Sequence, residues 1–302
     1  MSKISPRPCS VETCNSLLEN YSRRCEVLIT MSFNLFRIVN KMTKRTSVPD
    51  GARSLHRAIG LLRLLSARTA TGWRLSDLAQ EAALEHSTVH RMLSCLLKER
   101  LAMRVSGTRR YTLGPLAYEL GVAAAPHFAI ERLAGPALAQ LAAETRDIVF
   151  LNVLSGSESV CIARFEGRKA LKAYTVEVGT RRPLCLSAGG TAMLIGLPRA
   201  DQARIEAENL QAIQQRGEKR QSVIRRMLQR SRRLGYGWNQ EDLIPGIAAI
   251  GIAIRSATGS PVASISLGSS LAELGLPRRV QLIDRLRREA ERIEQQLVSL
   301  RY

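Results

Sequence analysis

The sequence predicts an α+β protein with two domains, and three observations support this fold class. The chain has 302 residues, which exceeds the usual size of a single domain. Residues 53–113 show three helical patterns followed by a hairpin pattern. Beyond residue 148, short strand patterns are mixed with helical ones, which is typical of an α+β domain.

Positive charge is concentrated in one part of the chain. The formal net charge is +19, and residues 41–114 carry fourteen Lys and Arg against five Asp and Glu, whereas residues 115–302 carry twenty-six against eighteen. Such a concentration is expected for a protein that binds the phosphate backbone. A solvated basic face without a partner would explain the charge equally well.

Several classes of protein are disfavoured by what the sequence lacks. Its six cysteines show neither a CxxC pair nor a Cys/His spacing typical of zinc sites, so we expect reduced thiols and neither a metal nor a cofactor. No run of 18 apolar residues could span a bilayer, and the N-terminus does not resemble a signal peptide. We therefore expect a cytoplasmic protein with no membrane partner.

Residues 1–50 show no sustained period, and we expect a poorly ordered tail. A basic, polar segment starts at Met42 and leads directly into the first helical pattern. We therefore hypothesise that translation starts at Met42.

Three helices are expected next. The first begins at Arg53, and its apolar face comprises Leu55, Ala58, Ile59, Leu62 and Leu65. After a turn at residues 71–73, a short second helix has the apolar positions Leu75, Leu78, Ala79 and Ala82, and Ser76 and Asp77 are expected to cap it. The third helix begins at Ser87 and Thr88, whose hydroxyls are expected to cap it, and it buries Val89, Leu93, Leu96 and Leu97.

A β-hairpin with a turn at residues 106–108 follows the third helix. This order of elements is that of a winged helix-turn-helix, in which the third helix fits the major groove of DNA. The residues expected to contact DNA are Ser87, Thr88, His90 and Arg91 on the helix and Arg104, Arg109 and Arg110 on the wing. His86 and His90 have a spacing that can hold a metal, but no third ligand lies nearby in the sequence, so no metal site is expected.

Four segments of this N-terminal part resemble the successive signatures of the IclR family of transcription regulators. These segments are residues 53–58, 75–79, 86–93 and 111–114, and the resemblance continues through residues 133–138, 178–184, 235–237 and 262–267. It implies a winged helix-turn-helix over residues 51–114, a helical linker over residues 115–130 that helps dimerisation, and a GAF-like effector-binding domain with a central antiparallel sheet over residues 131–302. The residues agree with this organisation, because helical patterns interrupted at Pro126 and Gly135–Pro136 precede strand patterns at 148–153, 159–163, 249–255 and 261–267.

The resemblance also implies a ligand pocket at the end of this sheet. The matching positions are Leu184, Cys185, Gly190, Thr191, Asn239, Ala249, Ser266 and Gly268. The amides of residues 188–191 before a helix could bind an anion, although an ordinary turn explains the two glycines as well. Thr191 stands where the family usually has Lys or Arg, and Asn239 stands where an acid is common. A less charged pocket favours an organic or aromatic acid over a very small oxoacid.

These features predict a sequence-specific transcription regulator, either a repressor or an activator. We expect a homodimer or homotetramer on a palindromic operator in double-stranded DNA, controlled by a small-molecule effector. Two alternatives remain at this point. One is a cysteine-dependent enzyme using Cys161 or Cys185, and it is disfavoured because all four histidines precede that domain. The other is a non-specific DNA-compacting protein.

Two further helices are expected in the second domain. The arginine-rich residues 219–233 should expose one basic face, and residues 280–297 should form an amphipathic closing helix.

Overall fold

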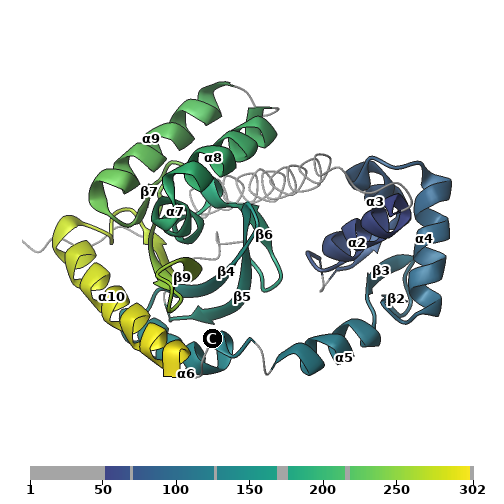
Figure 1. Cartoon of the computed structure of the whole chain (residues 1–302), viewed down its shortest axis with the longest axis horizontal. Coiled ribbons are helices and arrows are strands. Elements are labelled where there is room, and N and C mark those ends of the chain that lie inside the picture. Colours follow the sequence, from purple (N-terminus) through teal and green to yellow (C-terminus); the bar gives the residue numbers. More distant parts are fainter. Residues whose placement is uncertain (1–51, 69–70, 126–127, 169–175, 215–217, 300–302) are drawn as a thin grey trace, which may run out of the picture.

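The computed structural model describes residues 52–68, 71–125, 128–168, 176–214 and 218–299. The expected tail over residues 1–50, the start at Met42 and the interruption at Pro126 lie outside these described residues. Figure 1 shows the N-terminal helices at one end of the chain and a larger body built on a sheet at the other, with α5 running between them.

The N-terminal part is a winged helix-turn-helix, as expected. Its elements are α2 (Arg53–Leu65), β1 (Trp73–Arg74), α3 (Leu75–Ala82), α4 (His86–Lys98), β2 (Ala102–Arg104) and β3 (Arg110–Leu113). The three strands form an antiparallel sheet in the order β1-β3-β2. The core is apolar and joins all three helices to the sheet through Leu61, Leu64, Leu65, Trp73, Leu78, Val89, Leu93 and Leu96.

Two expected helix caps were wrong. α4 begins at His86 with Glu85 as its N-cap, so Ser87 and Thr88 lie inside the first turn, and neither caps the helix with its hydroxyl. α3 has Arg74 as its N-cap, and the Ser76 hydroxyl donates to the Asp77 carboxylate instead. Both N-cap residues have an extended backbone but no side-chain cap hydrogen bond, so packing rather than capping sets these helix starts.

The linker region contains α5 (Pro115–Ala124), followed by α6 (Ile130–Thr145). The expected break at Gly135–Pro136 is absent, because α6 continues through Pro136. Pro136 is exposed, whereas Ala134, Leu138 and Leu141 on the same helix are buried. The packing of this buried face outweighs the loss of one helical hydrogen bond at the proline.

The C-terminal part has a six-stranded antiparallel sheet in the order β6-β5-β4-β9-β8-β7. Its strands are β4 (Ile148–Ser155), β5 (Glu158–Glu166), β6 (Arg181–Pro183), β7 (Gly237–Gln240), β8 (Ile247–Arg255) and β9 (Pro261–Ser270). The expected strands correspond to β4, β5, β8 and β9. The two edge strands, β6 and β7, were not expected.

Helices cover both faces of this sheet. α6 and α10 (Leu276–Ser299) pack on one face through Leu138, Leu282, Leu286 and Ile293. The other face carries α7 (Ala188–Gly196), with α8 (Arg199–Gln214) and α9 (Glu218–Leu234) behind it (Figure 1). α7 approaches the sheet closely, because a Cβ at Gly237 or Gly251 would meet the Ala188 carbonyl. The α+β class with a central antiparallel sheet is therefore confirmed.

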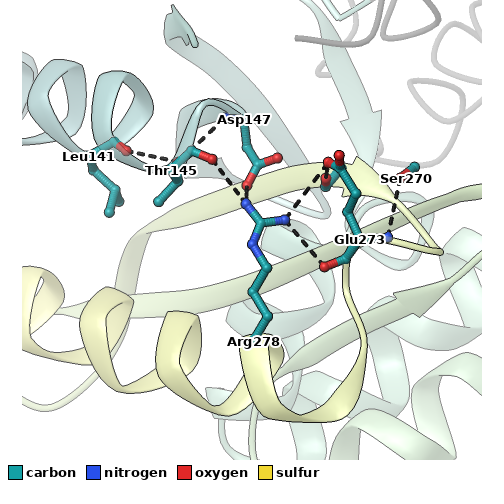
Figure 2. A network of polar contacts seen from close by, with 7 residues as sticks. Leu141, Thr145, Asp147, Ser270, Glu273 and Arg278 are labelled. Carbon is teal, nitrogen blue, oxygen red and sulfur yellow. Dashed lines mark hydrogen bonds and ion pairs between the residues drawn. The ribbon is translucent and has the colours of Figure 1, made fainter. Parts of the chain in front are cut away.

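A polar network fastens the start of β4 to α10 (Figure 2). The Arg278 guanidinium donates to the Asp147 carboxylate at 2.6 Å and to the Thr145 carbonyl at 2.9 Å. It also donates to the Glu273 carbonyl at 3.3 Å. Asp147 is almost fully buried, so this arginine supplies the counter-charge that its ionised form requires.

Candidate functional site

The expected DNA-contacting residues of α4 lie on its outer face. Val89, Leu93 and Leu96 are buried against α2 and α3, and helical spacing therefore turns Ser87, His90 and Arg91 outward. Thr88 is half-buried. The Glu85 carbonyl accepts from the amides of Thr88 and Val89, whereas the amides of His86 and Ser87 have no acceptor among the described residues. These two amides and the helix dipole favour a phosphate at this end of α4.

The three wing arginines have different environments. Arg109 is exposed, and Arg104 is exposed with its guanidinium 5.7 Å from the centre of the Tyr111 ring. Arg110 is half-buried and donates to the Gly72 carbonyl at 3.1 Å. Arg110 therefore holds the turn before β1 to the wing, in addition to any contact with DNA.

A depression of about 870 Å³ brings the wing arginines close to the starts of α3 and α4. It is lined by Arg74, Leu75, Ser76, His86, Arg104, Thr108, Arg109, Arg110 and Tyr111. Ser87, Thr88, His90 and Arg91 are not among its lining residues. Arg74, Ser76 and His86 were not expected at this surface, because the short strand β1 that orients Arg74 was not recognised in the sequence.

The second candidate site is a small cavity of about 70 Å³ between the sheet and the N-terminus of α7. Of the eight residues expected there, Asn239, Ala249, Ser266 and Gly268 line the cavity. Leu184, Cys185, Gly190 and Thr191 are not among its lining residues. They are buried beside it, where Leu184 and Cys185 belong to the core under α8 and α9.

Polar groups from several elements surround this cavity. The Asn152 amide donates to the Ser266 hydroxyl at 3.3 Å, and the Ser187 hydroxyl accepts from the Gly190 amide at 2.9 Å as the N-cap of α7. The amides of Ala188 and Gly189 have no acceptor within the described part of the chain. They lie at the positive end of the α7 dipole, which favours an anion.

Arg182 brings a cation to the cavity wall, which also includes Ser159 and Thr180. The remaining wall is largely apolar and comprises Phe150, Val176, Leu186, Leu243, Ile244 and Ile247. Neither Arg182 nor Asn152 was expected at the pocket. Arg182 lies in residues 178–184, which resemble a family segment. Which side chain of this segment faces the cavity, however, depends on how β6 pairs with β5, and the sequence does not show that pairing.

The two cysteines of this domain are inaccessible. Cys161 and Cys185 are 1% and 0% exposed. Burial raises the pKa of the Cys161 thiol to about 11, and burial likewise raises the pKa of the Cys185 thiol. A thiolate is the reactive form of cysteine, so both positions disfavour nucleophilic chemistry at neutral pH.

Two other kinds of feature are absent from the described residues. They contain no cluster of three or more His, Cys, Asp or Glu side chains placed to hold a metal ion. Nor does any described helix have the length and apolarity needed to cross a membrane.

Comparisons with known proteins agree on one family. The model for the bacterial transcriptional regulator IclR C-terminal domain matches residues 122–295, and that for the IclR helix-turn-helix domain matches residues 54–106. The HTH-type transcriptional repressor AllR of Klebsiella pneumoniae is 27% identical over 248 residues, covering 82% of this chain and 90% of that protein. The HTH-type transcriptional regulator BhcR of Paracoccus denitrificans is 28% identical over 218 residues, covering 72% and 77%.

Solved structures show the same fold. An IclR transcriptional regulator from Alicyclobacillus acidocaldarius has a TM-score of 0.65 at 23% identity, covering 83% of this chain and 100% of its own. An IclR homologue from Microbacterium hydrocarbonoxydans, complexed with 4-hydroxybenzoate, has a TM-score of 0.62 at 21% identity, covering 82% and 99%. The C-terminal family model spans more than half of the chain. The chain therefore belongs to the IclR family of transcriptional regulators, with an N-terminal helix-turn-helix domain and a C-terminal effector-binding domain.

Proposed function

We propose that this regulator binds a palindromic operator in double-stranded DNA as a homodimer or homotetramer, in the cytoplasm, and that a small organic acid controls the binding. In this proposal residues 51–114 bind DNA, residues 115–130 link the domains, and residues 131–302 bind the effector. The observation that carries the proposal is the exposed polar face of α4 next to a wing rich in arginine.

Each expected DNA contact has a role in this proposal. With α4 in the major groove, Arg91 and His90 reach base edges, while Ser87 and Thr88 lie near the phosphate bound by the helix start. Arg104, Arg109 and Arg110 of the wing approach the backbone or the minor groove. Arg74 and Ser76 add further phosphate contacts, because they line the same depression as the wing arginines.

The surface of α5 supports an oligomer. This helix has the sequence PLAYELGVAA, yet none of its residues is buried in the single chain. Tyr118, Leu120 and Val122 are more than half exposed. Exposed apolar surface of this kind marks an interaction site, and the same helix of a second copy would cover it. A two-fold dimer would then present two α4 helices to two half-sites of a palindrome.

The cavity next to α7 supports an acidic effector. The free amides of Ala188 and Gly189, together with Arg182, favour a carboxylate, and the apolar wall accepts a hydrocarbon body. The proposed contacts of the effector include the expected residues Leu184, Cys185, Gly190, Thr191, Asn239, Ala249, Ser266 and Gly268, of which the last four line the cavity.

The volume of the cavity limits the size of the effector that it can hold without a change in its wall. Its volume of about 70 Å³ is smaller than the roughly 150 Å³ that holds benzene in an apolar cavity. A small aliphatic acid therefore fits more readily than an aromatic one. An aromatic acid, like the one bound to the Microbacterium homologue, requires part of the wall to move outward.

We propose no enzymatic activity and no cofactor. The relatives are named transcription regulators, and the buried, high-pKa thiols of Cys161 and Cys185 offer no nucleophile. The rival proposal of non-specific DNA compaction predicts binding without preferred sites, which the following experiment distinguishes.

The test is footprinting of the purified protein on its own genomic DNA, followed by titration of the strongest site. We expect a few sharp palindromic sites. Arg91→Ala should weaken operator binding by about 1–3 kcal/mol, roughly 5- to 150-fold, because a side chain that reads a base edge is lost. Lys98→Ala, which removes an exposed cation at the last residue of α4, is the control and should have a smaller effect.

Two outcomes would contradict this proposal. Diffuse, salt-sensitive coverage without preferred sites would favour DNA compaction. If Arg91→Ala bound the operator as tightly as the parent protein, the docking of α4 would be wrong.

A further inference from the structure

A second cleft lies at the other end of β8 from the effector cavity. The cavity next to α7 is lined by Ile247 and Ala249 of β8, whereas this cleft is lined by Ile252, Ala253 and Arg255. β7 pairs with β8 only as far as Gly251, so residues 252–255 of β8 extend beyond their neighbour on that side. The cleft has a volume of about 560 Å³, which is within the usual range for small-molecule sites.

Four arginines from four different elements line this cleft. They are Arg199 at the start of α8, Arg232 of α9, Arg255 at the end of β8 and Arg287 of α10. Apolar side chains, including Ala192, Ile195, Ile252 and Ala290, also line it, together with the polar side chains of Gln202, Glu291 and Glu294. The arrangement combines an apolar surface with cations that approach from several directions.

Three glutamates offset much of this charge, but none of them forms an ion pair with Arg199 or Arg287. Glu294 accepts from the Arg255 backbone amide at 2.7 Å, and Glu206 pairs with Arg232 at 2.5 Å. Glu291 also lines the cleft and is exposed. The guanidinium groups of Arg199 and Arg287 have no ion pair or hydrogen bond with the described residues. The Arg255 guanidinium donates to the Gly259 carbonyl at 2.9 Å, so Arg199 and Arg287 are the two cations that a ligand with two anionic groups would neutralise.

We propose that this cleft binds a small organic polyanion, carrying a phosphate group or several carboxylates, at a site separate from the effector cavity. Arginine presents a planar fork of donors that matches both phosphate and carboxylate oxygens. Arg199 and Arg287 bind the anionic groups, and the side chains of Ala192, Ile195 and Ile252 contact the carbon skeleton. A concave site with converging charges suits a compact ligand better than a DNA backbone, which would follow an extended basic surface.

The experiment is calorimetric titration of the full chain with pyrophosphate and, separately, with citrate, at about 0.15 M salt to screen diffuse charge. The test variant is Arg199→Gln/Arg287→Gln. The matched control is Arg225→Gln/Arg226→Gln, which removes the same charge from exposed α9 residues that do not line the cleft. Melting temperatures of both variants verify that they fold.

We expect the parent and the control to bind at least one probe with equal affinity, and the test variant to bind at least tenfold more weakly. Operator affinity should be the same in the test variant and the control. Equal binding of the probes by all three proteins, or no binding by the parent up to roughly 10 mM, would overturn the proposal. A loss of operator affinity specific to the test variant would show that these arginines contact DNA instead, and would also overturn it.

Discussion

At the scale of single residues, Asp147 links pH to stability. Burial raises the pKa of its carboxyl, and hydrogen bonds from Ser269 and Arg278 and the charge of Arg278 oppose this shift without cancelling it. The folded state therefore binds the carboxyl proton of Asp147 more tightly than the unfolded chain does, in which an aspartate has a pKa of about 3.9. As the pH rises from that value through the raised pKa, ionisation of Asp147 lowers the free energy of unfolding.

Asp147→Asn should remove this pH dependence. We expect the difference in unfolding free energy, wild type minus variant, to fall as the pH rises above about 4, and to become constant once Asp147 is ionised. Urea unfolding at a series of pH values measures it. The exposed Asp284→Asn on α10 is the control, because it makes the same substitution at a carboxylate that is not buried. A difference that rose with pH for Asp147→Asn would mean that the Arg278 ion pair outweighs burial.

The three described cysteines should differ in reactivity. Cys95 on α4 is exposed, whereas Cys161 and Cys185 are buried and have raised thiol pKa values. Brief treatment of the native protein with iodoacetamide near pH 8, followed by peptide mass spectrometry, should find Cys95 modified and the other two protected. Unfolding in urea should expose all three. Rapid alkylation of Cys161 or Cys185 in the native state would revive the proposal of a cysteine-dependent enzyme.

At the scale of elements, we expect one wing arginine to affect only DNA binding and another to affect DNA binding and stability. Arg109 is exposed, so Arg109→Gln should leave the melting temperature unchanged and reduce the slope of log affinity against log salt by about one. Arg110→Gln also loses the bond to the Gly72 carbonyl, so its melting temperature should fall as well. Salt-dependent operator titrations and thermal melts measure the two effects. Identical melting temperatures for the two variants would argue against the structural role of Arg110.

The elements that could be predicted from the sequence are those that bury several side chains on one face. In the three N-terminal helices and α10, apolar residues recur every three or four positions, and the structure has all four helices. β1, β6 and β7 have two, three and four residues, and each pairs with a longer strand. Segments this short show no periodic pattern of apolar residues, so they could not be predicted from the sequence.

The two candidate sites also differ in how far the sequence predicts them. The outer face of α4 could be predicted, because it depends on the period of one helix. The cavity wall depends on pairing between strands far apart in sequence, and a shift of one residue exchanges the two faces of a strand. Arg182 and Asn152 were missed for this reason. Asn239, Ala249, Ser266 and Gly268 were expected at the pocket from family resemblance rather than from any pattern in the residues.

At the scale of the whole molecule, the C-terminal end of α2 contacts the segment that borders the cavity next to α7. A Cβ at Gly179 would lie 2.7 Å from the Ser66 carbonyl oxygen, so the two backbones are in close contact. Burial raises the pKa of Glu158, and this shift is opposed first by Arg181, which pairs with Glu158 at 2.9 Å, and then by the charge of Arg63 on α2. Thr180 and Arg182 in the same segment line the cavity. We therefore expect a ligand bound in this cavity to affect the DNA-binding part through this contact.

Gly179→Ala should disrupt that contact. Gly179 has a φ of +88°, so alanine costs about 1 kcal/mol in backbone strain there, and its methyl group would also displace Ser66. Gly156→Ala is the matched control, because Gly156 has a φ of +63° and open space around its Cβ position. We expect faster amide hydrogen exchange at the end of α2 and a several-fold change in operator affinity in Gly179→Ala alone. If both variants matched the parent in exchange and affinity, this contact would not couple the two domains in solution.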